Sequence, residues 1–123
     1  FHNRSRKPLI IPYSMLPKRL SELVSIKNKL IYDFGLKVSK KNNFKIYQKF
    51  CIVQTPLAIV YALSICKSGE VNNIFLAGFD GYTSDNPAID ETDFVIKNFK
   101  KQFKKINIKT LTPTAYNLEK GDI

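Results

Sequence analysis

The side chains best suited to chemistry stand directly after short apolar segments. Asp80 follows residues 73–78 (NIFLAG), and Thr55 follows the similar segment FCIVQ. Residues 112–116 (TPTAY) come after a third apolar segment. A carboxylate there can accept hydrogen bonds from sugar or ribose hydroxyls or help to hold a divalent cation, and threonine hydroxyls can donate to phosphate. These residues predict a small-ligand site if the three segments meet in the fold.

Alternating strand and helix signals in the second half of the chain bring the three segments to one sheet edge. Strand, helix, strand, helix and strand with short connections predict right-handed βαβ units and a parallel sheet. Ligands bind beyond the carboxyl ends of such strands. The predicted elements are a buried strand at 50–54, a mostly buried helix at 57–67 capped by Thr55 and Pro56, a strand at 73–78 buried on both faces, an amphipathic helix after Asn86 and Pro87, and a strand at 106–111, before a tail at 112–123.

The first half carries weaker signals for the same kind of structure. Leu16, Leu20, Leu23 and Val24 have the spacing of a helix face. The predicted elements are a strand at 8–13, a helix at 14–26, a strand at 29–32, a turn at 33–35 and a loop at 37–45 whose ends can form short edge strands.

A length of 123 residues predicts one domain, residues 1–123. We expect a three-layer Rossmann-like α/β fold with a mainly parallel sheet and helices on both faces. Because the chain begins at Phe1 without an initiator Met, we also expect a C-terminal fragment of a larger protein.

The formal charge of +10 does not by itself predict a nucleic-acid partner. Lys, Asn and Ile account for 41 residues, a bias typical of an AT-rich genome, and no RNA-binding or zinc-finger motif accompanies the charge. The longest apolar run, 56–66, is too short to span a membrane. These features favour a cytoplasmic protein with a solvated basic surface.

Motifs for nucleophilic, nucleotide or metal chemistry are missing from the sequence. Cys51 and Cys66 lie in apolar runs, where cysteine behaves as a small buried hydrophobe. The only histidine is His2, and neither G-x-G-x-x-G, a Walker A loop nor G-x-S-x-G occurs. Catalytic residues are therefore not predicted, and the cofactor stays unassigned. Five acids between Asp80 and Asp93 can hold Mg²⁺, although helix capping explains much of that cluster.

Each candidate site residue has a structural alternative. Asp80 followed by Gly81 is also a common turn dipeptide. Tyr82 and Tyr116 can stack on a base or sugar ring, or lie partly buried with the hydroxyl in water. The predicted ligand-binding residues are Gln54, Thr55, Gly78, Asp80, Tyr82, Thr112 and Thr114.

Four segments resemble a known family. They are DFGLKV (33–38), FCIVQTPLAIVYALSI (50–65), NIFLAGFDGYTSDNP (73–87) and LTPTAYNL (111–118). In order and spacing they resemble the C-terminal Rossmann-like domain of bacterial aldolase-like proteins, near the 4-hydroxy-2-oxovalerate aldolase and HMG-CoA lyase group. The resemblance implies an upstream aldolase-type TIM barrel in the same parent chain, and a place in cell-surface polysaccharide biosynthesis.

A weaker likeness concerns the segment around Asp80. IFLAGFDGY (74–82) is similar to bacterial sialyltransferases that use CMP-activated nonulosonic acids, and this likeness implies a nucleotide or sugar beside Gly78, Asp80 and the TPT loop. Those enzymes use a histidine that residues 80–105 lack. The leading hypothesis is thus an accessory ligand-binding or assembly domain. The alternatives are a glycosyltransferase-like domain that binds a nucleotide sugar such as a CMP-sugar, and a structural module that forms a homodimer.

Overall fold

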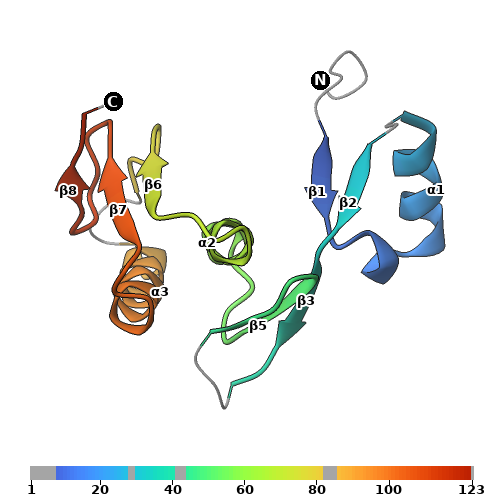
Figure 1. Ribbon diagram of the computed structural model, residues 1–123, viewed down its shortest axis with the longest axis horizontal. Helices are drawn as coiled ribbons and strands as arrows, with labels where there is room; N and C mark the ends of the chain where they lie inside the picture. Colours follow the sequence, from blue (N-terminus) through green and yellow to red (C-terminus); the bar gives the residue numbers. More distant parts are fainter. Residues whose placement is uncertain (1–7, 28–29, 41–43, 82–85, 123) are drawn as a thin grey trace.

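The computed structural model describes residues 8–27, 30–40, 44–81 and 86–122 as a mixed α/β fold (Figure 1). Its elements in chain order are β1 Leu9–Ile11, the 3-10 helix η2 Tyr13–Met15, α1 Lys18–Lys27, β2 Ile31–Asp33, β3 Gly35–Val38, β4 Lys45–Ile46, β5 Phe50–Val53, α2 Ala58–Ser68, β6 Asn73–Leu76, α3 Ala88–Gln102, β7 Asn107–Thr110 and β8 Glu119–Lys120.

The described strands form three short sheets, ordered β1-β2, β3-β5-β4 and β6-β7-β8. Only the β4–β5 pair is antiparallel among them, so the expectation of mainly parallel pairing is confirmed. A single sheet is not formed, because β5 and β6 belong to different sheets. The antiparallel strand β4 occupies the second edge of β5, with Lys45 opposite Ile52, and leaves no edge there for β6.

One apolar core joins α2 and α3 to the second and third sheets. Phe99 of α3 is fully buried, and its ring meets Phe44 and Phe103 edge-on at centroid distances of 5.2 and 4.9 Å. Val95 and Ile96 are buried on the same helix, which confirms the predicted apolar stripe. Asp90 and Glu91 lie in its first turn, as expected from the helix dipole.

The predicted helix at 57–67 is present as α2, and most of its side chains are buried or half-buried, as expected. In α2 one face is buried, through Val60, Leu63 and Ser64, whereas Ala58 and Ala62 are exposed. The helix begins later than the capping signal indicates. Leu57 is extended and its N–H donates to the carbonyl oxygen of Thr55, so neither Thr55 nor Pro56 opens the helix.

Strand β6 is buried on one face only, contrary to the sequence prediction. Ile74 is 7% exposed and lies opposite Ile108 of β7, whereas Phe75 is 45% exposed. The apolar sequence of this strand therefore does not indicate two covered faces. The short strand β8 in the predicted tail is a further element that the sequence analysis missed.

The predicted turn at 33–35 is replaced by extended chain. Phe34 donates its N–H to Ile11 of β1, and Gly35 donates its N–H to Lys49 beside β5. The same extended segment thus leaves the first sheet and enters the second. Strands β3 and β4 confirm the edge strands expected at the ends of the 37–45 loop.

The predicted helix at 14–26 is divided into η2 and α1. Pro17 stands between them, and its carbonyl oxygen accepts the N–H groups of Leu20 and Ser21. Proline is suited to the start of a helix and not to its interior, which explains the break. Within the part of the chain that the structure describes, no helix is long and apolar enough to cross a membrane.

Candidate functional site

The loops that follow β6 and β7 are joined by hydrogen bonds. The N–H of Gly78 donates to Oγ1 of Thr112 at 2.9 Å, and the N–H of Ala115 donates to the carbonyl oxygen of Asp80 at 2.7 Å. The parallel pairing of the two strands brings these loops to the same edge. The structure therefore brings together four predicted ligand-binding residues, Gly78, Asp80, Thr112 and Thr114, on two adjacent loops.

The first loop depends on two glycines with left-handed backbone. Gly78 has a φ of +69° and Gly81 a φ of +94°. A Cβ at Gly81 would lie 3.0 Å from Cβ of Ala115 and 3.0 Å from the ring of Tyr116, so this glycine also permits close contact between the loops. This geometry supports the turn alternative for Asp80, and the exposed residue is also available to a ligand.

A hollow of about 310 Å³ lies beside the second loop. Its polar lining includes Thr112, Thr114 and Lys120, and its apolar lining includes Tyr116 and Leu118. Oγ1 of Thr112 accepts the N–H of Gly78, and Oγ1 of Thr114 accepts the N–H of Tyr116 at 3.3 Å. Each of these threonine oxygens accepts a hydrogen bond from a backbone N–H. The hydroxyl hydrogen of each threonine can therefore point at an anionic ligand.

Tyr116 contributes packing and not an open stacking surface. It is 5% exposed, and its ring stacks on Phe79 with centroids 4.9 Å apart and an interplanar angle of 27°. The sequence allowed either ligand stacking or burial for this tyrosine, and in the structure Tyr116 is buried. Tyr82 lies outside the described residues.

Gln54 and Thr55 do not share the edge of β6 and β7. Both follow β5, the middle strand of another sheet. Gln54 borders a cavity of about 10 Å³ together with Phe44 and Asn98, which is too small for a ligand. Gln54 and Thr55 were predicted to bind ligand because β5, β6 and β7 were expected to share one sheet edge. That edge is not formed, and the ligand-binding role of both residues stays a prediction.

The two cysteines are not activated nucleophiles. Burial raises the pKa of the Cys51 thiol, against a smaller lowering by its hydrogen bond with Ser64, and burial likewise raises the pKa of Cys66. A raised pKa keeps each thiol protonated at neutral pH. Across the described ranges, no three His, Cys, Asp or Glu side chains gather as metal ligands do, and Asp85 of the predicted acidic cluster lies outside those ranges.

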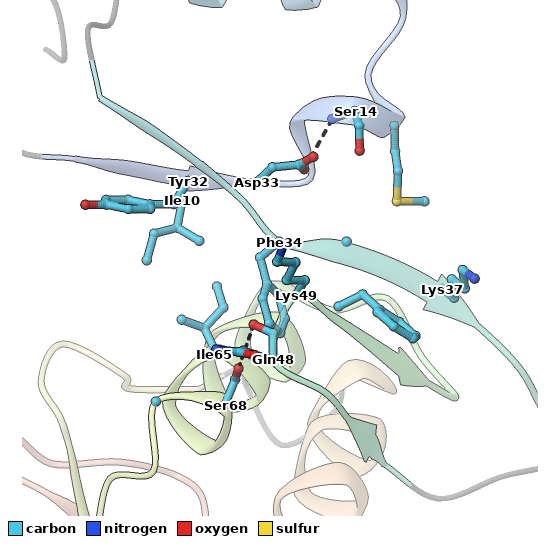
Figure 2. A pocket seen from close by; sticks show the side chains of 14 residues that line it. Ile10, Ser14, Tyr32, Asp33, Phe34, Lys37, Gln48, Lys49, Ile65 and Ser68 are labelled. Carbon is cyan, nitrogen blue, oxygen red and sulfur yellow. Dashed lines mark hydrogen bonds between the residues drawn. The ribbon is translucent and has the colours of Figure 1, made fainter.

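A larger groove of about 870 Å³ separates the first sheet from α2 and β5 (Figure 2). Ile10 and Tyr32 lie on one wall, and Ile65 of α2 lies on the other. Nζ of Lys37 lies 5.1 Å from the ring centre of Phe50 on the same groove. The sequence did not predict the groove, since the groove arises from the separation of the sheets and no local sequence signal marks it.

Comparison with known proteins found no matching family model, no matching curated protein and no matching solved structure.

Proposed function

We propose that this chain is an accessory ligand-binding domain of an aldolase-type protein linked to cell-surface carbohydrate metabolism. Its ligand is a sugar or nucleotide that carries a phosphate or carboxylate group, and it binds at the loops after β6 and β7. The observation that carries this proposal is the shared hollow of Thr112, Thr114 and Lys120. Two hydroxyl donors and one ammonium group suit an anion.

The neighbouring loop supplies the complementary group for hydroxyls of the same ligand. The peptide groups of Asp80 and Ala115 are hydrogen-bonded, so the Asp80 carboxylate belongs to the same loop pair as the threonines. A carboxylate accepts hydrogen bonds from ribose or sugar hydroxyls and repels a phosphate. This separation of charge favours a ligand with hydroxyls at one end and an anionic group at the other, such as a nucleotide or a nonulosonic acid.

The proposal is a binding role without chemistry in this domain, and the aldolase chemistry belongs to an upstream barrel of the parent chain. A glycosyltransferase-like use of the same loops is the alternative. The three-layer Rossmann-like arrangement is also part of the proposal. It is supported by the parallel β6–α3–β7 crossover, which is the unit from which such folds are built.

Thermal unfolding with CMP, CDP and UDP-glucose tests the proposal. We expect CDP to raise Tm of the wild type because a ligand that binds only the folded state stabilises it. Lys120→Gln should weaken CDP binding by about 10-fold, the effect of losing one charge-assisted hydrogen bond of about 1.4 kcal/mol. Lys104→Gln is the matched control, because it removes the same charge from an exposed position outside the hollow.

Inorganic phosphate serves as the control for non-specific attraction to a chain of charge +10. Equal weakening by Lys120→Gln and Lys104→Gln would contradict the site, as would the absence of any Tm shift with all three nucleotides.

A further inference from the structure

The sheet β3-β5-β4 has one covered face and one open face. Cys51 and Val53 of β5 are 0% and 1% exposed and belong to the core. Because side chains alternate along a strand, Phe50 and Ile52 point to the opposite face, where both are half-buried. Residues paired in register share a face, so the neighbours of these two side chains on β3 and β4 belong to the open face as well.

Two rows of side chains cross the open face. In the first row Tyr47 lies beside Phe50, to whose carbonyl oxygen it donates its N–H at 2.9 Å. In the second row Ile52 lies between Lys37 of β3 and Lys45 of β4. The rows are two residues apart along β5, or about 7 Å. A row of aromatic rings therefore runs beside a row of ammonium groups.

The rings of the first row form a stack that ends at an exposed ring. The centroids of Tyr47 and Phe50 are 4.5 Å apart with an interplanar angle of 22°, and Nζ of Lys37 lies 5.1 Å from the ring centre of Phe50. Tyr47 is 47% exposed, and Oγ of Ser68 on α2 donates to its carbonyl oxygen at 2.9 Å. An unpaired nucleobase can extend this stack at Tyr47, since every base has a π-face.

The part of the chain that builds this sheet and α2 contains no acidic residue. Between Asp33 and Glu70 the sequence has six lysines and neither Asp nor Glu. Asp33 itself ends β2, and its carboxylate accepts an N–H of η2 at 3.2 Å. In the described part of the chain, none of Lys37, Lys45 and Lys49 pairs with a carboxylate. Composition explains the number of lysines, but it does not explain their separation from the acids beside an aromatic stack. This face is complementary to a polyanion that carries rings.

We infer that the open face of β3, β5 and β4 binds single-stranded nucleic acid. A base stacks on Tyr47 while phosphates approach Lys37 and Lys45, the combination of aromatic platform and basic surface that binds single strands without sequence preference. Lys37 and Lys49 also line the groove of about 870 Å³, a concave path that admits a strand but not a flat bilayer (Figure 2). None of these residues lines the hollow at the loops after β6 and β7, so this inference and the proposed function can fail separately.

Fluorescence anisotropy of the purified chain with labelled dT and U decamers tests the inference. We expect saturable binding of both decamers, with a Kd of about 1–100 µM, and a linear fall of log affinity with log salt. Lys37→Gln with Lys45→Gln should reduce the salt slope by about 1.4, because each phosphate contact on a single strand contributes about 0.7. Lys101→Gln with Lys104→Gln is the matched control, since it removes the same charge from exposed positions of α3 and should leave the slope unchanged.

An aromatic variant tests the stacking separately from the charge. Tyr47→Ala should weaken decamer binding at least about 5-fold through the loss of one base stack, whereas Tyr47→Phe keeps the ring and should bind as the wild type does. Phe94→Ala, which removes a 58% exposed ring from α3, should bind as the wild type does too. Circular dichroism should be unchanged in all three variants.

Two competitors separate single strands from other polyanions. A DNA duplex of the same length offers no unpaired base, and poly-L-glutamate offers charge without rings, so both should displace the labelled decamer at least about 5-fold less effectively than unlabelled dT decamer does. Equal competition by either polymer would overturn the inference. The absence of saturable binding in low salt would overturn it as well, as would equal losses in Tyr47→Ala and Phe94→Ala.

Discussion

At the scale of single residues, the paired loops depend on a position without a Cβ. In Gly81→Ala the new Cβ meets Ala115 and Tyr116 at 3.0 Å and the residue must keep a φ near +94°, so we expect a loss of about 2–3 kcal/mol in the free energy of unfolding. Gly78→Ala is the control. It has a φ of +69° but no atom within 4 Å of the new Cβ, so we expect only about 1 kcal/mol. Urea denaturation measures both, and equal losses would contradict the close contact.

Tyr61 gives a pH-dependent test of the junction between the first two sheets. Its hydroxyl donates to the carbonyl oxygen of Phe34 at 2.6 Å. Burial first, and then the nearby Cys51 and Asp33, raise the pKa of Tyr61 from 10.0 to about 12. Tyr61→Phe should therefore be less stable than wild type by about 1–2 kcal/mol at pH 8, because the carbonyl loses its donor.

The stabilising effect of Tyr61 should diminish at alkaline pH. The unfolded state releases the phenolic proton near pH 10, whereas the folded state keeps it until about pH 12, so this stabilisation is complete below pH 10 and is lost as pH rises through 12. Urea midpoints of wild type and Tyr61→Phe at pH 8 and 11.5 should converge. A stability difference that does not change with pH would show that the hydroxyl is not held in its protonated form.

At the scale of elements, α3 contributes the largest fully buried side chain of the core, Phe99. Phe99→Ala should cost about 3–5 kcal/mol, because the side chain is fully buried against Phe44 and Phe103. Phe94→Ala on the same helix should cost less than about 1 kcal/mol, since that ring is 58% exposed. Chemical denaturation of the two variants gives the comparison. Similar losses at both positions would mean that α3 packs through a different face.

The same helix shows what sequence pattern predicts well. Its apolar stripe and acidic first turn are local signals, and both are present in the structure. The start of α2 was misjudged because the Thr55–Pro56 signal is equally compatible with the turn that Leu57 and Thr55 form. The burial of both faces of β6 was predicted wrongly, because an uninterrupted apolar sequence does not indicate which face of a strand is covered.

At the scale of the whole molecule, the parallel pairing of β6 with β7 was predictable, and the division into three sheets was not. The crossover through α3 specifies parallel neighbours. By contrast, β4 occupies an edge of β5 through residues that gave only a weak strand signal. The placement of the candidate site residues was predictable in part. Thr112, Thr114, Gly78 and Asp80 meet because β6 and β7 pair, whereas Gln54 was included through a shared edge that does not form.

The central claim is that the loops after β6 and β7 bind a hydroxylated anion. Titration of the ¹⁵N-labelled chain with CDP, followed by amide chemical shifts, tests it most directly. The account predicts saturable shifts centred on Gly78, Asp80, Thr112 and Lys120, which Asp80→Asn weakens and the exposed control Asp93→Asn does not. Shifts confined to the lysine-rich face of α3, or the absence of saturable shifts at these loops, would contradict the claim.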